Sequence, residues 1–555
     1  MTLSARSILN RWPLWLGIGF VLITVGYPVG FLFLQSLFPN LHLGSLEGFG
    51  SDYLRIFQTE DILQMIVNSV LWASATTVVS WVLGIPAGWL LARTNLPAKP
   101  VARIILLIPV MAPAYINALA YILVMQQGGF ADSLPLGVPE WLRDLFFGFW
   151  GVTFVMAIVS FGAVALATEA ILRSLPNRLE DAASSLGASR GQVLRWILIP
   201  LLLPAILNAG ILVFLEAIAN FGVPAILGPR ANLPLLPAEI YHLVTSWPID
   251  FPLATALSGL LCVIAILLVT LSNRILSRQA LIRSRIGAIR EKSLSPSQKV
   301  VAWLYFGFLF AIGVAIPNAA IVFASLVESW NAGALPSLTF ANYIAFFAPD
   351  SRGVEALQTS LLLSVGAATV CTLVGGIASY AIFRYPGPTS RFADVLGLLP
   401  RVVPNIVVAI AFIMAWNAPW ILLEIYNTIW ILFLAYLALY QSDALRYGSA
   451  GMSQVGKNLE DAAASLGANR FQILRMVVFP LLRPSLFVAW ALTFVVCMRD
   501  WVASIILLPP GVETVGSYLF NEFDQGNLSN AMVMATLTVL LSSAVLLAIQ
   551  RKPKV

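Results

Sequence analysis

The hydrophobic pattern of this chain consists of long apolar runs separated by short polar loops. A helix that crosses a bilayer needs roughly 20 consecutive apolar residues, and about twelve runs of that length recur along the sequence. They lie at 14–36, 62–91, 104–125, 148–172, 201–227, 252–273, 300–325, 358–383, 394–416, 420–442, 481–508 and 530–549. The tenth run has the least distinct ends, because Glu424, Asn427 and Asp443 interrupt them. The pattern predicts an all-α membrane protein with about 12 transmembrane helices.

The same pattern contains an internal repeat. Residues 179–190 match residues 459–470 almost position by position, and Pro109 and Pro113 recur as Pro400 and Pro404. An even number of spans separates the two copies, so both copies face the same side of the membrane. The sequence therefore predicts two parallel six-helix halves, unlike the inverted repeats of many secondary transporters. We expect a first half at 1–285, a linker at 286–299 and a second half at 300–555.

Charge gives the orientation of these spans. The chain is 59% hydrophobic and only 10% charged, and its mean hydropathy is +0.87. With both termini in the cytoplasm, all but five of the 32 Lys and Arg residues fall on the cytoplasmic side. The exceptions are Arg55, Arg143, Arg230, Arg352 and Arg499. This asymmetry follows the positive-inside rule, and the net charge of +6 needs no nucleic acid to explain it.

Other compositional features exclude several classes of protein. The first apolar run is too long for the core of a signal peptide and has no small-residue cleavage site, so we expect an uncleaved helix. Cys262, Cys371 and Cys497 lie within apolar runs, where we expect them to be small apolar core residues. Their spacing matches neither a disulfide framework nor a CxxC metal motif. His42 and His242 are far apart in the sequence. We expect no metal site and no catalytic residue in this chain.

The repeated cytoplasmic loop has a readable local structure. Good helix formers run from Glu180 to Leu186, and Gly187 suits the left-handed conformation that ends a helix. Ser189 and Gln192 then form a capping-box pattern for a second helix, and Asn469 with Gln472 repeats it. A single copy of this loop could be a solvated hairpin without function. Two near-identical copies on one side of the membrane favour a shared docking role.

The loop resembles the coupling loop, or EAA loop, of type I ABC importer permeases. That pattern is Glu-Ala-Ala, three residues, Gly, nine residues, Ile, one residue, Leu-Pro. Asp181-Ala-Ala with Gly187, Ile197 and Pro200 follows it, and so does Asp461-Ala-Ala with Gly467, Val477 and Pro480. The departures are Asp for Glu at 181 and 461, Val477 for Ile, and Ile199 or Phe479 before the proline.

The resemblance implies a permease that works with two copies of an ATP-binding subunit and a periplasmic solute-binding protein in the bacterial inner membrane. The short helix of each loop would be a coupling helix that docks on the ATP-binding subunit. The implied coupling residues are Glu180, Asp181, Ala182, Ala183, Gly187, Glu460, Asp461, Ala462, Ala463 and Gly467. ATP and Mg would be bound by the partner subunits, and this chain would hold no cofactor.

One stretch imitates a nucleotide-binding loop. Residues 451–458 nearly fit the P-loop pattern G-x4-G-K-[ST], but Asn458 stands where a Ser or Thr hydroxyl must bind magnesium. The residues before Gly451 form a membrane helix, whereas a P-loop follows a strand. We expect ATP hydrolysis to come from another chain.

Polar residues within the apolar runs are the candidates for a translocation pathway, because an ionised side chain in a bilayer is costly and usually functional. The candidates are Glu169, Glu216, Asn220, Arg499 and Asp500. Asn220 and Asp500 occupy matching positions of the two halves, and an aromatic residue follows each. Glu216, Asn220, Arg499 and Asp500 are predicted to line the route. Alternatively, Arg499 pairs with Glu216 or another acid and only holds the structure together.

Further stretches suggest the solute. Residues 219–225, 243–248 and 498–503 resemble the fused ferric-iron permeases, which would make iron the transported ion. That family more often has Asp where Asn220 stands, so fused permeases for thiamine, phosphonates and related solutes remain alternatives. An ion-coupled secondary transporter and a passive channel are alternatives of another class. The paired coupling motifs and the parallel repeat argue against the secondary transporter, and the sparse polar lining argues against the channel.

Overall fold

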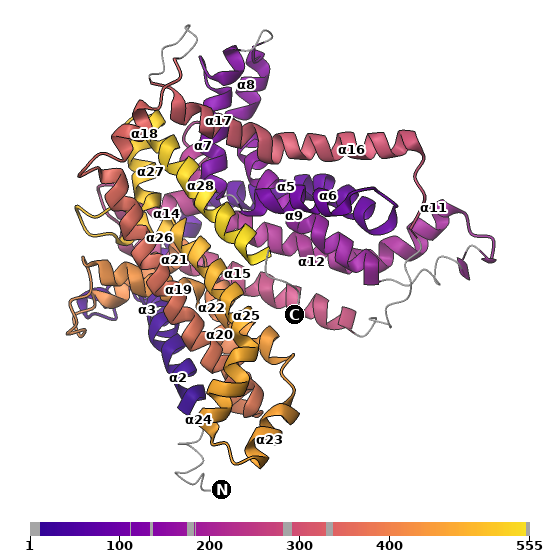
Figure 1. Ribbon diagram of the computed structural model, residues 1–555. Helices are drawn as coiled ribbons and strands as arrows, with labels where there is room; N and C mark the ends of the chain where they lie inside the picture. Colours follow the sequence, from indigo (N-terminus) through magenta and orange to yellow (C-terminus); the bar gives the residue numbers. More distant parts are fainter. Residues whose placement is uncertain are drawn as a thin grey trace. The chain divides into compact units, whose positions relative to one another are not determined.

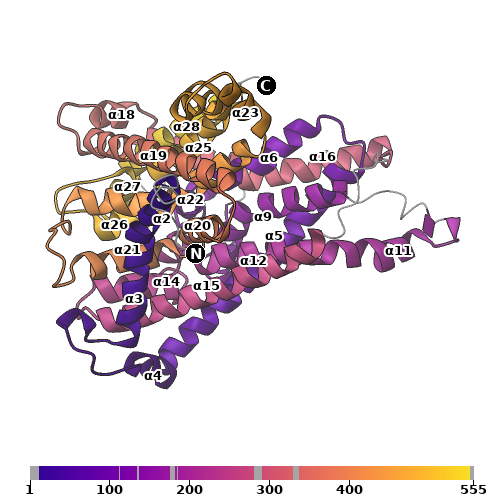
Figure 2. The same cartoon turned by 90° about the horizontal axis from the view of Figure 1, so that it is seen from below.

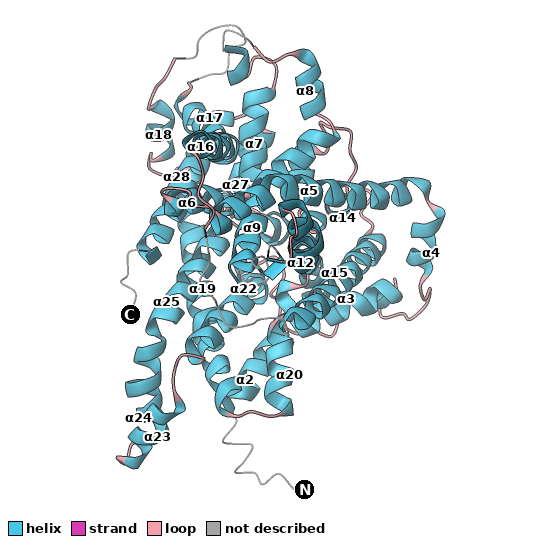
Figure 3. Cartoon of the chain, turned by 90° about the vertical axis from the view of Figure 1, so that its right-hand side faces the viewer, coloured by secondary structure: helices cyan, strands magenta, loops and turns pink. Residues whose placement is uncertain are grey.

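The computed structural model describes residues 12–111, 113–133, 137–174, 182–183, 185–280, 291–328 and 337–550. These residues form helices joined by loops, with two isolated β-bridges and no longer strand among them (Figure 3). Nine helices in this part of the chain are long and apolar enough to cross a membrane, and two bent helix pairs raise the number of candidate spans to 11. The predicted all-α membrane fold is confirmed.

Most spans coincide with the predicted apolar runs. The straight or gently interrupted ones are Trp12–Leu37 (α2, η1, α3), α5 Glu60–Arg93, α9 Phe149–Ser174, Gly191–Ile218 (ending as α12 Ile199–Ile218), α15 Phe251–Ala280, Pro296–Leu326 (α16, η5, α17), α19 Arg352–Arg384, Leu474–Met498 (ending as α25 Phe479–Met498) and α28 Leu528–Gln550. Shorter helices between the spans include α4 Ser51–Gln58, α8 Glu140–Phe146, α14 Leu236–Thr245, α18 Ala341–Phe346 and α27 Val515–Asp524.

The third and ninth spans are bent pairs, and prolines shared by the repeat explain the bends. Helix α6 Lys99–Met111 precedes α7 Ala114–Met125, and α20 Pro388–Gly397 with Leu399–Arg401 precedes α21 Asn405–Trp416. The two pairs turn by 90° and 102°. Pro113 and Pro404 stand just before α7 and α21 with extended ψ angles of 133° and 143°. A proline cannot donate the helical hydrogen bond, so each span restarts in a new direction.

The tenth predicted span is not among the 11 candidate spans of the described residues, and the helix found in its place begins later than predicted. Helix α22 runs over Ile429–Met452, whereas the apolar run was placed at 420–442. Residues 417–428 form a loop in which Asn427 has a φ of 60°, a conformation that does not continue a helix. Trp420 of this loop packs edge-on against Phe31, with ring centroids 5.4 Å apart. The apolar residues of this segment pack within the protein as a loop, and their apolarity alone led to the wrong prediction of a membrane helix from residue 420.

One compact unit contains residues 56–242 and 263–340. Its centre is the pair α5 and α9, with α12 and α6 packed beside them. Gly84 and Gly88 of α5 make this packing close, because a Cβ atom at these positions would lie 2.6 and 2.4 Å from carbonyl oxygens of α9. Small residues at a helix contact are the usual means of tight packing in membranes.

The other compact unit contains residues 1–55, 243–262 and 341–555. Helices α19, α22 and α25 form its centre (Figure 1). Gly375 of α19 occupies the position that Gly84 has in α5, and a Cβ atom there would lie 2.9 Å from the backbone of α22. The same contact thus organises both units.

The first helix of each sequence half packs in the unit built on the other half. The first span, α2 Trp12–Val21 and α3 Tyr27–Leu37, contacts α19, α20 and α21, and α2 runs beside α19 and α20 (Figure 2). The seventh span, α16 Pro296–Phe310 and α17 Ile316–Leu326, contacts α5, α6 and α7. Tyr27 donates a hydrogen bond to the Ala415 carbonyl, and Tyr305 donates one to the Leu83 carbonyl. The packing units and the sequence repeat therefore divide the chain differently.

Candidate functional site

The two copies of the repeated loop adopt the same turn. Gly187 and Gly467 have φ angles of +84° and +86°, which confirms the left-handed conformation expected of them. The Ala188 amide bonds the Ala183 carbonyl at 3.0 Å, and the Ala468 amide bonds the Ala463 carbonyl at 3.1 Å. This hydrogen bond across a left-handed glycine is the Schellman closure of a helix.

A capping box then starts the second helix of each loop. Ser189 and Gln192 exchange side-chain-to-amide hydrogen bonds of 2.8 and 3.4 Å, and Asn469 and Gln472 exchange bonds of 2.8 and 2.9 Å. Short helices follow, α11 Arg190–Val193 and α24 Arg470–Ile473, and each continues through a π-helical turn into α12 or α25. The predicted glycine break and returning helix are present in both copies, and the short helix before the break is described in the second copy as α23 Lys457–Ser465.

The short helix of the second copy, α23 Lys457–Ser465, has two distinct faces. Glu460 is buried, and Ala463 packs on a buried apolar cluster. Its members are Met452, Val455, Ile473, Val478 and Leu482. Asp461 and Ala462 are exposed on the opposite side. The predicted coupling residues of this helix therefore split into a pair that faces the body of the unit and a pair that faces outward.

In the first copy, Ala182 lies in a helical turn and is exposed, and Ala183 is half-buried. Glu180 and Asp181 lie outside the described residues. Their coupling role stays a prediction.

The outward faces carry apolar side chains at matching positions. Leu186 and Leu466, each just before its glycine, are both 89% exposed. Trp196 and Met476 also match in the repeat and are 71% and 73% exposed. In the first copy, Leu186, Trp196 and their neighbours line a hollow of about 360 Å³. Exposed apolar side chains on such a turn suit contact with another protein.

An ion pair that sequence reasoning missed fixes the inner face of α23. Nε of Arg384, the last residue of α19, donates to Oε1 of Glu460 at 2.8 Å, and Nη2 of the same arginine donates to the same oxygen. The side chains are only 13% and 10% exposed. The available signal was the repeat itself, because Arg93 ends α5 just as Arg384 ends α19, and Glu180 matches Glu460.

The fifth and eleventh spans are both broken at the predicted polar residues. Helix α12 ends at Ile218 and α13 Gly222–Leu227 follows, while α25 ends at Met498 and α26 Val502–Leu507 follows. Asn220 Oδ1 accepts from the Val223 amide at 3.0 Å. Asp500 Oδ2 accepts from the Ala503 and Ser504 amides at 3.1 and 3.3 Å. A break in a membrane helix exposes amides that have no water to bond, and these side chains satisfy them.

Comparison with known proteins gives the family. The sequence pattern of "Binding-protein-dependent transport system inner membrane component" matches residues 84–281 and 372–552, one copy in each half. The chain belongs to this family. It is the permease component of an ABC importer and a multi-pass inner membrane protein.

Curated relatives extend over most of the permease. It is 23% identical to the ferric transport system permease protein FbpB of Actinobacillus pleuropneumoniae, over 94% of this chain and 75% of that protein. It is 24% identical to the Fe(3+)-transport system permease protein FbpB 2 of Haemophilus influenzae, over 96% and 97% of the two chains. A putative 2-aminoethylphosphonate transport system permease of Salmonella typhimurium is 29% identical over 47% of this chain and 97% of its own length.

The remaining pathway candidates of the permease have different surroundings. Asp500 is buried, and its Oδ1 accepts from the Tyr440 hydroxyl at 2.7 Å. Glu216 is exposed, and its carboxylate accepts from the Ser160 hydroxyl at 3.5 Å. Arg499 is half-buried. Their role in lining the route stays a prediction.

Glu169 forms ion pairs with two arginine side chains. Its Oε1 lies 2.6 Å from Arg103 Nη2 of α6 and 2.9 Å from Arg173 Nε of α9, and the carboxylate is buried. A carboxylate held by two arginines ties the bent third span to the fourth. In the second half, Arg401 lies 3.3 Å from Asp443 of α22, but both of these side chains are far more exposed than Glu169.

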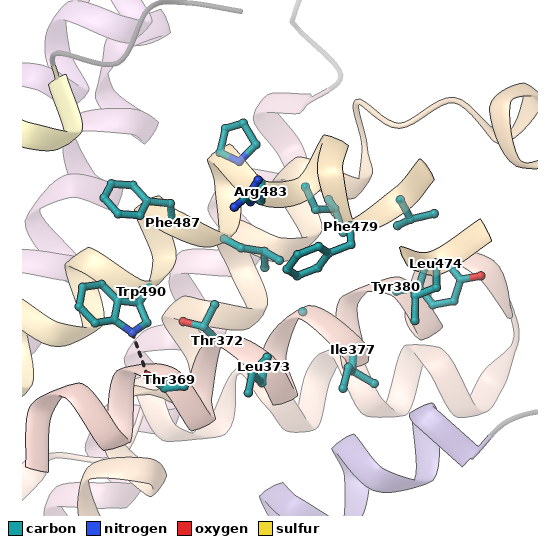
Figure 4. A pocket seen from close by; sticks show the side chains of 15 residues that line it. Thr369, Thr372, Leu373, Ile377, Tyr380, Leu474, Phe479, Arg483, Phe487 and Trp490 are labelled. Carbon is teal, nitrogen blue, oxygen red and sulfur yellow. Dashed lines mark hydrogen bonds between the residues drawn. The ribbon is translucent and has the colours of Figure 1, made fainter. Parts of the chain in front are cut away.

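A groove of about 960 Å³ runs between α19 and α25 of the permease (Figure 4). Its walls are mainly apolar, and Arg483 stands on the α25 side. Trp490 of α25 crosses it to donate a hydrogen bond to Thr369 of α19 at 3.1 Å. Neither Arg499 nor Asp500 lines the groove.

Two observations concern metals and nucleotides. Across the ranges that the structure describes, no three His, Cys, Asp or Glu side chains lie close enough to hold a metal ion. The segment that imitates a P-loop begins in the last turn of α22, so a helix precedes Gly451 where a P-loop has a strand.

Proposed function

We propose that this permease moves ferric iron, delivered by a periplasmic binding protein, into the cytoplasm, and that two ATP-binding subunits docked on its two coupling loops supply the energy. The observation that carries the proposal is the pair of matching loops in one chain. Each has a glycine in the left-handed conformation, the same helix closure and an exposed leucine at the turn. One polypeptide therefore offers two equivalent docking sites.

The choice of iron rests on the relatives. Two ferric transport permeases resemble this chain over nearly its whole length, and the phosphonate permease resembles about half of it. Phosphonates are the second candidate solutes for this reason.

The solute is tested by reconstitution. The permease, its ATP-binding subunit and its periplasmic binding protein are reconstituted in proteoliposomes, with ATP on one side of the membrane and the binding protein on the other. We expect uptake of ferric iron that stops when ATP is replaced by a non-hydrolysable analogue. Uptake of 2-aminoethylphosphonate or thiamine in place of iron would contradict the assigned solute. Uptake driven by an ion gradient without ATP would contradict the importer mechanism and support a secondary transporter.

The composition of the complex is a separate prediction. Because one chain has two docking loops, the detergent-purified complex should contain one permease chain and two ATP-binding subunits. Both loops and both chain termini should face the cytoplasm, where nearly all Lys and Arg residues fall in the proposed orientation. Native mass spectrometry gives the stoichiometry. Two permease chains for two ATP-binding subunits would show that the two halves do not suffice.

A further inference from the structure

We propose that the Arg384–Glu460 ion pair locks the coupling helix α23 to the membrane helix α19, so that the two move as one body when the ATP-binding subunits close. The inference rests on the proposed coupling function of this loop. Neither residue is proposed to touch ATP or solute. Both are positioning residues that convert movement of a short surface helix into movement of a membrane span.

The geometry of α23 is the first support. Glu460 lies on the face of α23 that points into the unit, while Asp461, Ala462 and Leu466 remain exposed for a partner. A buried carboxylate that accepts from two nitrogens of one guanidinium has little freedom to rotate. The exposed face of α23 is therefore available for docking, and Glu460 is committed to α19.

The nature of the pair is the second support. Burying two charges carries a desolvation penalty, and apolar residues of similar volume often stabilise a protein as well or better. The neighbouring cluster around Val478 already packs Ala463 of α23 and Tyr380 of α19 together. A buried ion pair is therefore not needed for cohesion here. What it adds is a fixed direction and register between the two helices.

The form of α19 is the third support. It has 33 residues without an internal proline, so at 1.5 Å per residue it is about 50 Å long. At its other end, Arg352 pairs with Glu513 at 2.8 Å, and Ser360 Oγ accepts from the Val515 amide of α27 at 2.8 Å. A single continuous helix thus joins α23 to the segment at the opposite end of the span.

The repeat supports the same interpretation for the first half. Ser69 of α5 accepts from the Leu236 amide of α14 at 2.8 Å, which matches the bond between Ser360 and Val515. Arg93 ends α5 at the position of Arg384. Glu180 stands at the position of Glu460, so the sequence of the first half contains a matching Arg and Glu for both members of the ion pair.

The test separates coupling from assembly. In the reconstituted complex, Glu460→Gln and Arg384→Gln should still bind the ATP-binding subunits and hydrolyse ATP. Solute taken up per ATP hydrolysed should fall by about tenfold or more, within the usual range of coupling free energies. The exchanged double variant, Arg384→Glu with Glu460→Arg, should recover a large part of that ratio. Arg384→Lys keeps the charge but not the two-nitrogen contact, and should give an intermediate ratio.

The control is Arg401→Gln, which breaks a pair in the same unit whose side chains are 58% and 36% exposed. It should leave the ratio unchanged, because exposed ion pairs contribute little.

A normal ratio in both single variants, or no recovery in the exchanged double, would overturn the proposal. Loss of subunit binding would make Glu460 a contact residue and would also overturn it. If a single variant is not recovered from the membrane, the ratio of uptake to ATP hydrolysis in Arg384→Lys and in the exchanged double variant tests the proposal instead. A wild-type complex without ATP-driven uptake would contradict the proposed function instead.

Discussion

Replacing both Gly187 and Gly467 with Val is expected to abolish most ATP-driven uptake while leaving the permease inserted and assembled. Both glycines have a positive φ, and a β-branched residue there is strained by roughly 1–2 kcal/mol. A Cβ atom at either position has no neighbour within 4 Å, so the substitution creates strain without a clash. The turn should relax by reorienting the coupling helix. We expect uptake to fall roughly tenfold or more at a nearly unchanged ATPase rate.

Gly191 provides the matched control. It is an exposed glycine in α11, only four residues after Gly187, and a Cβ atom there also has no neighbour within 4 Å. Its φ is not positive, so Gly191→Val should leave uptake near the wild-type rate. Uptake and ATP hydrolysis are measured in the same proteoliposomes. Normal uptake by the double variant would remove the assignment of these loops as coupling elements.

Asp500→Asn is expected to lower uptake by tenfold or more with little loss of stability. The single oxygen of Asn can cap α26 while its NH2 group donates to the Tyr440 hydroxyl oxygen, and the first half already uses Asn220 in the matching position. What it removes is the charge. A cation near a carboxylate is stabilised by about 4 kcal/mol at an effective dielectric constant of about 20, and each 1.4 kcal/mol corresponds to roughly a factor of ten.

Asp500→Ala separates the capping role from the pathway role. It removes the cap of α26, worth about 1 kcal/mol, and leaves the buried Tyr440 hydroxyl without its acceptor, which costs roughly 1–3 kcal/mol. The Ala variant should therefore lower both the melting temperature of the complex and its uptake. Uptake and thermal unfolding are measured side by side for both variants. If Asp500→Asn transports at the wild-type rate, Asp500 is a capping residue only.

The breaks in the spans show how far sequence reasoning reached. Matching positions of Asn220 and Asp500 in the repeat identified both residues as special. Their polarity predicts a lining role, and the structure adds a second role, because each side chain accepts hydrogen bonds from amides at a helix break. The run of apolar residues gave no sign of the break, because hydropathy is the same for a continuous span and for two helices joined by a turn.

The sequence by itself determined the class of fold, the parallel repeat and the structure of the coupling loops. The left-handed glycine and the capping box are set by residues within a few positions of each other, a span is set by one continuous apolar run, and the repeat is visible when two stretches of sequence are compared. The closures at Gly187 and Gly467 are accordingly as expected.

Only the tertiary structure decided which residues meet across the chain. It placed the first and seventh spans against the opposite halves, showed residues 417–428 to be a loop, and brought Arg384 to Glu460. Each depends on packing between segments far apart in the sequence. An apolar run states that a helix must be buried or face lipid, but it does not say which neighbour covers it. Likewise, a charge near the end of a span looks like an ordinary solvated residue until the helix that covers it is in place.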